Sequence, residues 1–157
     1  MAKEVERKFL VQGDSWRSGV TRRLSLCQGY LSVGADCSVR VRFDGEHGFL
    51  TVKGRRQGHT REEYEYQIDA DEARTMIDRL CGGRRVAKVR HFVPFGVWTI
   101  VVDEYEDENA GLVLAELELD VAAAWPETWP EWIGAEVTDD DRFYNAHLSS
   151  SPFGSWS

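Results

Sequence analysis

Charged residues recur at a spacing of two residues in six separate segments of this chain. In a β-strand successive side chains point to opposite faces of the sheet, so charges two residues apart share one face. One such group means little, because a half-buried strand often turns a polar face to water. Six of them in a small chain indicate a shared charged interior. The groups are Glu4 with Glu6 and Lys8, Arg40 with Arg42, Lys53 with Arg55, Glu63 with Glu65, Lys88 with Arg90, and Glu116 with Glu118.

Short strands are the main element that the sequence predicts. Apolar runs bounded by turn residues predict strands at 3–11, 26–33, 37–43, 48–55, 61–68, 85–92, 97–105 and 112–119. One helix is expected after the fifth strand, capped by Asp69 or Asp71 and ended by Gly82-Gly83. A second helix is expected to start near Thr138. Eight short strands with few helices predict a mainly β (α+β) fold, either a closed antiparallel barrel or a sandwich.

Length, charge and cysteine usage limit the class of protein. The 157 residues are expected to form one domain at 1–148, followed by a weakly ordered tail at 149–157. No apolar stretch approaches the roughly 18 residues of a membrane span, and the charged N-terminus does not resemble a signal peptide. Cys27, Cys37 and Cys81 are an odd number without metal-ligand spacing, which predicts reduced thiols in the cytoplasm. The lack of an apolar span means that no membrane is expected as a partner. The net charge of -8 argues against a nucleic-acid surface, so no nucleic acid is expected as a partner either.

Apolar residues occupy the opposite faces of the charged strands. Val39, Val41 and Phe43 alternate with two arginines, for example. This alternation fits both a barrel with a charged lumen and a sandwich with its charges in water, so periodicity alone leaves both folds open. The charges favour the barrel, because grouped carboxylates repel one another unless a divalent cation lies among them. Grouped lysines and arginines likewise repel unless a polyanion lies between them, and the residues therefore indicate a hard metal ion together with a phosphate chain.

The same residues resemble the signature of a known family. Glu4-Val5-Glu6-Arg7-Lys8 is similar to the ExExK motif of the CYTH proteins, the triphosphate tunnel metalloenzymes, and in particular of their short, single-domain bacterial members. The resemblance extends through Gln28-Gly29-Tyr30-Leu31, Val39-Arg40-Val41-Arg42, Leu50-Thr51-Val52-Lys53, Glu63-Tyr64-Glu65-Tyr66, Lys88-Val89-Arg90, Asp103 and Ala115-Glu116-Leu117-Glu118-Leu119. It implies an eight-stranded antiparallel β-barrel, or tunnel, with a few short helices.

The resemblance also implies a role for each charged group. The basic residues match contacts to substrate phosphates, namely Lys8, Arg40, Arg42, Lys53, Lys88 and Arg90. Five acidic residues match ligands of Mg²⁺ or Mn²⁺, namely Glu4, Glu6, Asp103, Glu116 and Glu118. The mechanism expected from these residues has Glu63 or Glu65 orient or deprotonate the attacking water, and Lys88 or Arg90 stabilise the leaving group. Tyr30 is a further catalytic candidate near the phosphate chain. The spacing leaves open which carboxylate activates water.

The expected activity is metal-dependent hydrolysis of a small triphosphate, with inorganic tripolyphosphate cleaved to pyrophosphate and phosphate. The inorganic substrate is favoured because the chain is short and shows no obvious module for recognising a base. The same tunnel could instead serve an adenylate cyclase or a thiamine triphosphatase, or it could bind polyphosphate without turnover. The loop at 54–60 is basic and Gly-rich, and it could alter the choice of substrate at the tunnel mouth, where Arg55 and Arg61 are candidates.

Overall fold

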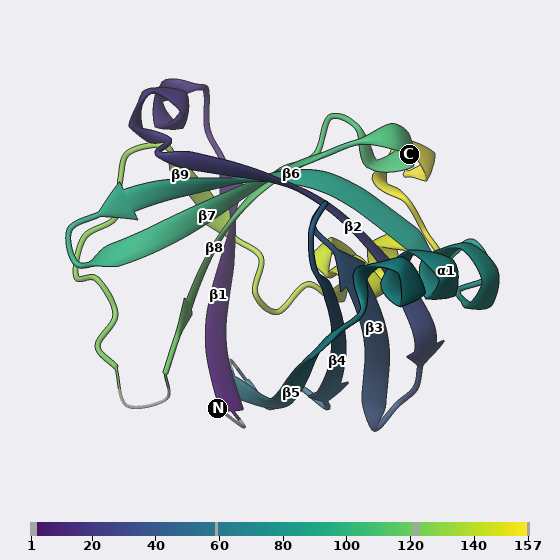
Figure 1. Cartoon of the computed structure of the whole chain (residues 1–157). Coiled ribbons are helices and arrows are strands. Elements are labelled where there is room, and N and C mark those ends of the chain that lie inside the picture. Colours follow the sequence, from purple (N-terminus) through teal and green to yellow (C-terminus); the bar gives the residue numbers. More distant parts are fainter. Residues whose placement is uncertain (1–2, 59, 121–122, 157) are drawn as a thin grey trace.

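The protein, described here by a computed structural model, is built on one antiparallel sheet of nine strands (Figure 1). Residues 3–58, 60–120 and 123–156 are described, except for the side chains of Lys3 and Glu4. The strands are β1 (Lys3–Val11), β2 (Arg22–Val33), β3 (Cys37–Phe43), β4 (Gly48–Gly54), β5 (Thr60–Ile68), β6 (Arg85–Phe95), β7 (Trp98–Tyr105), β8 (Val113–Leu119) and β9 (Ile133–Glu136).

The sheet closes on itself. Its strand order is β5-β4-β3-β2-β6-β7-β8-β1-β9, and β5 also pairs with β1. Eight strands therefore form a ring, and β9 extends the sheet beside β1 at Phe9 and Val11. The prediction of a mainly β fold with an eight-stranded antiparallel barrel is confirmed.

The helices are short and lie outside the sheet. They are α1 (Ala70–Leu80) and α2 (Asn145–Leu148), with 3-10 turns at Ser15–Gly19, Asp107–Asn109, Asp141–Phe143 and Phe153–Ser155. Asp69 caps α1 as predicted, because its side chain accepts a hydrogen bond from the backbone N–H of Glu72 at 3.0 Å. After α1, Gly82 takes a φ of 59°, a left-handed conformation that favours glycine. Neither helix of the described chain combines the length and the apolar run that crossing a membrane requires.

The helix predicted to start near Thr138 is wrong in position. Thr138 lies in a turn after β9, and its hydroxyl oxygen accepts a hydrogen bond from the backbone N–H of Lys8 at 2.9 Å and donates one to Glu136 at 2.6 Å. The hydroxyl therefore serves β1 and does not cap a helix. Helical turns begin only at Asp141, where the side chain of Asp140 accepts from a backbone N–H. The strand β9 was not predicted, since four residues that include a glycine show no alternation.

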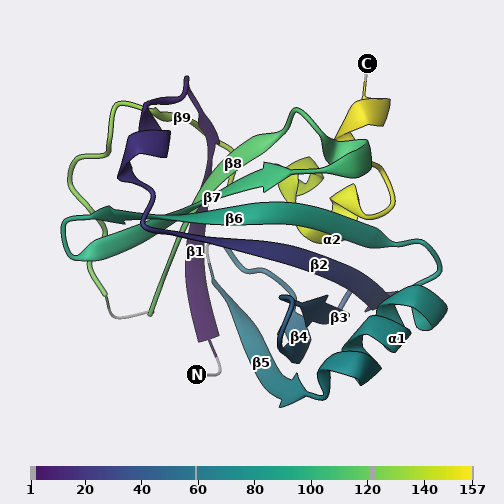
Figure 2. The ribbon, with the colours of Figure 1, turned by 45° about the horizontal axis from the view of Figure 1, so that its top comes forward.

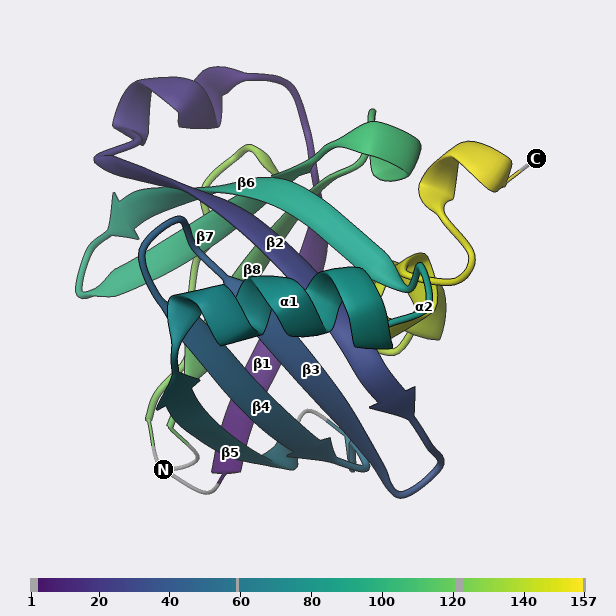
Figure 3. The same cartoon turned by 45° about the vertical axis from the view of Figure 1, so that its right-hand side comes forward.

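Two apolar clusters lie outside the ring, and they show which face of the sheet carries the charged side chains. Val41 of β3 packs with Ala73 and Ile77 of α1, which crosses the outer faces of β2, β3 and β4 (Figure 3). On the opposite wall Ala115 of β8 packs with Trp132 of the segment before β9. Because these residues face outward, the charged residues that alternate with them face the lumen.

The C-terminal segment packs against one end of the ring. Phe143 and Leu148 share an apolar cluster with Leu114 of β8, and Phe153 and Trp156 pack on that cluster. The backbone N–H of Phe153 also donates to the side chain of Asn109 at 2.8 Å, and the last turn lies beside the 3-10 turn at 107–109 (Figure 2). Residues 149–156, for which the sequence predicts little order, thus make apolar and polar contacts with the domain.

Candidate active site

The lumen contains a cavity of about 210 Å³ that is lined mainly by charged side chains from facing walls of the ring. Its predicted lining residues are Glu6, Lys8, Tyr30, Arg40, Arg42, Lys53, Glu63, Glu65, Arg90, Glu116 and Glu118, with Arg61, the candidate for the tunnel mouth, and they are joined by Ser38, Tyr144, Asn145 and Ala146. Strand alternation is the cause, because charged residues two apart on one strand share the lumen face. Arg55 is an exception, because it follows the last residue of β4 and its guanidinium pairs with Asp36 at 3.0 Å.

Three predicted site residues lie elsewhere or cannot be placed. Lys88 and Asp103 face the same lumen but lie deeper than the cavity lining, with exposed fractions of 0% and 3%. The side chain of Glu4 falls outside the described part of the structure. The backbone of Glu4 is opposite Arg61 in the pairing between β1 and β5.

Asp103 is the counter-ion of two buried cations. One of its carboxylate oxygens accepts from Lys88 Nζ at 2.7 Å and from Arg90 Nη2 at 2.9 Å. The other accepts from Arg90 Nε at 2.8 Å. Burial disfavours the charge of Asp103, but Arg90 and Lys88 outweigh that cost and hold the pKa of the carboxyl well below its usual range. Both oxygens of Asp103 are thus engaged by β6, the neighbouring strand.

The cations of this group are crowded. Burial, together with the nearby Arg90 and Arg42, lowers the pKa of Lys88 to about 7 in spite of its contact with Asp103. Burial and the charges of Arg40 and Arg90 lower the pKa of Arg42 to about 9, which leaves its guanidinium charged at neutral pH. Cations are therefore grouped along β3 and β6 in the lumen of a protein whose net charge is -8. Such an arrangement is suited to a polyanion.

The basic residues of the lumen form a basic wall, namely Lys8, Arg40, Arg42, Lys53, Arg61, Lys88 and Arg90. Several hydrogen-bond donors on or beside this wall have no partner among the described residues. Arg40 is only 5% exposed, and its Nη2 donates to Thr51 at 3.3 Å while its Nε is left without an acceptor. The side-chain nitrogen of Gln28 and the Nε of Arg61 are likewise buried without an acceptor. Buried donors are normally satisfied, so unpartnered donors around a polar cavity suit an acceptor-rich ligand such as phosphate.

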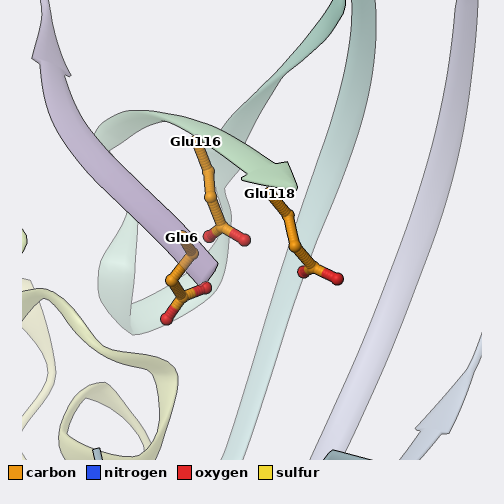
Figure 4. A group of neighbouring side chains, drawn as sticks. All are labelled: Glu6, Glu116 and Glu118. Atoms are coloured by element: carbon orange, nitrogen blue, oxygen red, sulfur yellow. The ribbon is translucent and has the colours of Figure 1, made fainter. Parts of the chain in front are cut away.

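Three carboxylates of the acidic wall converge. Glu6 of β1 lies directly opposite Glu118 of β8, and Glu116 is the next lumen residue along β8. Figure 4 shows their side chains directed toward a common region, and one oxygen from each lies within 4.8 Å of the others. Lys8 Nζ lies 3.4 Å from Glu116, and although burial disfavours ionisation, Lys8 and Arg90 lower the pKa of Glu116 well below its usual range. An all-oxygen donor set that includes an ionised carboxylate fits a hard divalent cation such as Mg²⁺ or Mn²⁺.

The two carboxylates predicted to activate water lie on β5, the strand that pairs with β4. Glu65 accepts a hydrogen bond from the Thr51 hydroxyl at 3.0 Å, and Arg40 Nη2 lies 3.9 Å from it. Glu63 lines the cavity opposite Lys53 in the pairing between β4 and β5. Tyr30, which is 4% exposed, lines the cavity from β2 and is the cross-strand neighbour of Arg40.

Some residues of the site have no role predicted from the sequence. Gln28 and Thr51 share the lumen face with Tyr30 and Lys53, so the same alternation that identified the charges could have found them. Tyr144 follows no strand periodicity and comes from the C-terminal segment. Its place in the cavity depends on tertiary packing that no local pattern records.

Comparison with known proteins relates this geometry to a family. The CYTH domain family matches residues 2–144 of the chain. An inorganic triphosphatase of Acetivibrio thermocellus is 43% identical over 154 residues, which cover 98% of this chain and 97% of that protein. An inorganic triphosphatase of Nitrosomonas europaea is 37% identical over 152 residues, which cover 94% of this chain and 97% of that protein. The crystal structure of the inorganic triphosphatase NE1496 is similar with a TM-score of 0.68 and 33% identity, and the match covers 95% of each chain.

Proposed function

This chain belongs to the CYTH domain family, and on that premise we propose that it is a metal-dependent inorganic triphosphatase that cleaves triphosphate into pyrophosphate and phosphate. The observation that carries the proposal is the cavity itself, where a wall of cations with unpartnered donors faces a cluster of three carboxylates. Phosphoryl transfer needs positioning and neutralisation of charge more than it needs covalent chemistry, and fixed charges supply both.

The basic wall is proposed to bind the phosphate chain. Its members that line the cavity are Arg40, Arg42, Lys53, Arg61 and Arg90, together with Lys8, which lies on β1 beside the acidic cluster. Arginine forks and lysine ammonium groups are both suited to phosphate oxygens, and buried donors of this kind strengthen the contact. Lys88 lies deeper than the cavity lining and shares the counter-ion Asp103 with Arg90, so it is proposed to help hold Arg90 in position.

The acidic cluster is proposed to hold Mg²⁺ or Mn²⁺ through Glu6, Glu116 and Glu118, with Glu4 as a further ligand. When bound, such an ion would neutralise charge on the phosphate chain. Asp103, which the family resemblance implies as a ligand, is assigned a different role. Its two oxygens accept three hydrogen bonds from Lys88 and Arg90, so we propose that it orients these cations.

The protein's own groups account for the hydrolytic step. Glu63 or Glu65 is proposed to accept a proton from water while the water oxygen bonds to the terminal phosphorus. The bond from that phosphorus to the bridging oxygen breaks, and pyrophosphate leaves with the electron pair. Arg90 stabilises the charge that develops on the leaving group, and Tyr30 is proposed to contact the same phosphate chain.

A substrate panel tests the activity. We expect tripolyphosphate to be hydrolysed with a higher kcat/KM than ATP or thiamine triphosphate, and pyrophosphate to be a poor substrate, because the cavity lining is mainly charged and suits a phosphate chain. Phosphate release would be measured for each compound at equal metal concentration. Cyclic AMP as the main product from ATP would identify a cyclase instead. Tight binding of tripolyphosphate without any turnover would identify a binding module.

Replacement of the basic wall should weaken substrate binding in particular. Arg40→Ala or Arg42→Ala removes a charge-assisted contact of about 1.5–3 kcal/mol, so KM for tripolyphosphate should rise roughly 10- to 100-fold. The metal concentration for half activity should change little. Arg23→Ala is the matched control, because Arg23 is an exposed arginine on β2 that does not line the cavity. An unchanged KM in both lumen variants would contradict the assigned role.

A further inference from the structure

The ring is closed by a short seam between β1 and β5. Within the described ranges 3–58 and 60–120, three residue pairs join these strands, from Lys3 opposite Glu62 to Val5 opposite Thr60. Beyond them the segment after β9 becomes the partner of β1. The backbone N–H of Val137 donates to Lys8 O at 2.8 Å, and Lys8 N–H donates to the Thr138 hydroxyl at 2.9 Å. The C-terminal segment therefore continues the wall of the tunnel where β5 leaves it.

Tyr144 lies at this seam with three cations around its ring. Lys8 Nζ is 4.4 Å from the ring centroid, and the guanidinium carbons of Arg56 and Arg61 are 4.6 Å and 5.4 Å from it. These distances are within the range of cation–π attraction. The Lys8 ammonium also donates to the backbone oxygen of Phe143 at 3.4 Å, so two consecutive residues of the C-terminal segment contact it.

Hydrogen bonds fix the position of the ring. The Tyr144 hydroxyl donates to Thr138 O at 2.8 Å and accepts from Arg56 Nη1 at 2.6 Å. Arg56 also donates to Thr138 O, and its Nη2 donates to Asp141 at 2.7 Å. Arg56 belongs to the loop between β4 and β5. The Arg56 guanidinium thus links this loop to the C-terminal segment by hydrogen bonds. Burial together with Glu6 raises the pKa of Tyr144, so the phenol stays neutral.

We propose that Tyr144 is a positioning residue for triphosphate, whose ring holds the ammonium of Lys8 and the guanidinium of Arg61 at the cavity, and that Arg56 acts through Tyr144. The chemistry of the ring explains why an aromatic residue stands here. Lys8 already has Glu116 at 3.4 Å, and a further carboxylate in place of the ring would neutralise the cations, whereas the face of a ring attracts them and adds no negative charge. Because Lys8 is placed here as a phosphate contact, this inference rests on the proposed function.

Two replacements of Tyr144 separate the ring from its hydroxyl. Tyr144→Leu removes the ring, and we expect KM and the calorimetric Kd for tripolyphosphate to rise about tenfold while kcat changes less than about threefold. Tyr144→Phe keeps the ring, and KM should stay within about threefold of the original value. Tyr66→Leu is the control, because Tyr66 is an exposed tyrosine on β5 that does not line the cavity. Equal KM values for Tyr144→Leu and the control would overturn the proposal, and so would equal losses in both Tyr144 variants.

A double-replacement cycle tests the role of Arg56. If Arg56 acts through Tyr144, Arg56→Ala should raise KM in the original protein and have little further effect in Tyr144→Leu. Additive effects would show that Arg56 acts on its own. Arg142→Ala is the matched control, because Arg142 is an exposed arginine of the same segment whose side chain pairs with Asp140 at 2.7 Å.

Proton NMR supplies a readout that does not depend on turnover. The side-chain methylene protons of Lys8 next to its ammonium should be shifted upfield by the ring in the original protein and in Tyr144→Phe. The shift should disappear in Tyr144→Leu, and its absence from the original protein would overturn the positioning claim even if Tyr144→Leu did not fold. An original protein with the shift but without hydrolysis of tripolyphosphate would instead refute the proposed function.

Discussion

Treatment with a chelator should abolish hydrolysis of tripolyphosphate, and added Mg²⁺ or Mn²⁺ should restore it. The carboxylates of Glu6, Glu116 and Glu118 each place an oxygen within 4.8 Å of the others, and a triphosphate brings further negative charge into the same lumen. Without a divalent cation these charges repel one another and the substrate. Phosphate release would be followed during a titration with chelator and then with metal. Full hydrolysis in excess chelator would refute a metal-dependent mechanism.

Replacement of one ligand should shift this metal dependence. Glu118→Gln keeps the shape of the side chain and removes its charge, so the metal concentration for half activity should rise at least about tenfold and excess metal should restore part of the activity. The increase of melting temperature that metal alone produces should also be smaller in the variant. Glu72→Gln on α1 is the control, since it removes a carboxylate from the outer surface. Equal metal responses in the two variants would place the metal elsewhere.

The sequence predicted the strands and their charged faces because that signal is local and periodic. Arg40 and Arg42 alternate with Val41, and the same alternation in the other strands places charges on one face. Alternation could not by itself distinguish a barrel from a sandwich, because the apolar face looks the same in both folds. The structure resolves this through α1, which covers Val41 from outside the ring.

The parts that sequence reasoning missed depend on contacts between distant segments. The short strand β9 forms because β1 offers it an edge at Phe9 and Val11, and nothing in its own four residues indicates a strand. Thr138 resembles a helix cap in sequence, but its hydroxyl bonds the backbone of Lys8, which is 130 residues away. Tyr144 enters the lumen for the same reason, since the segment that carries it is held against β1.

Asp103→Asn should destabilise the protein more than Arg40→Ala or Glu118→Gln does. The change leaves Lys88, which is fully buried, and Arg90 without the carboxylate that accepts their three hydrogen bonds. Removing one partner of a buried ion pair costs about 3–5 kcal/mol in free energy of unfolding. For a domain of this size that loss corresponds to a fall in melting temperature of roughly 6–20 °C. Activity should fall as well, because Arg90 would lose its orientation at the cavity.

The dependence of this effect on pH follows from the sign of the pKa shift. The folded-state pKa of Asp103 is lowered, so its contribution to stability is present above the unfolded-state pKa of about 4 and is lost as the pH falls below it. The melting temperatures of the original protein and of Asp103→Asn should therefore differ most near neutral pH and converge in acid. Asp78→Asn is the control, because Asp78 pairs with Arg85 on the surface, where such a pair contributes about 1 kcal/mol or less.

Triphosphate should partly replace the missing carboxylate. Arg90 lines the cavity, so a bound polyanion can supply negative charge to the cations that Asp103→Asn leaves unpaired. Tripolyphosphate should therefore raise the melting temperature of Asp103→Asn by more than it raises that of the original protein, when each is measured at a saturating concentration. A variant that is as stable as the original protein and gains no more from tripolyphosphate would show that Asp103 is not the counter-ion of this wall. Its carboxylate would then be free for the metal, as the family resemblance implies.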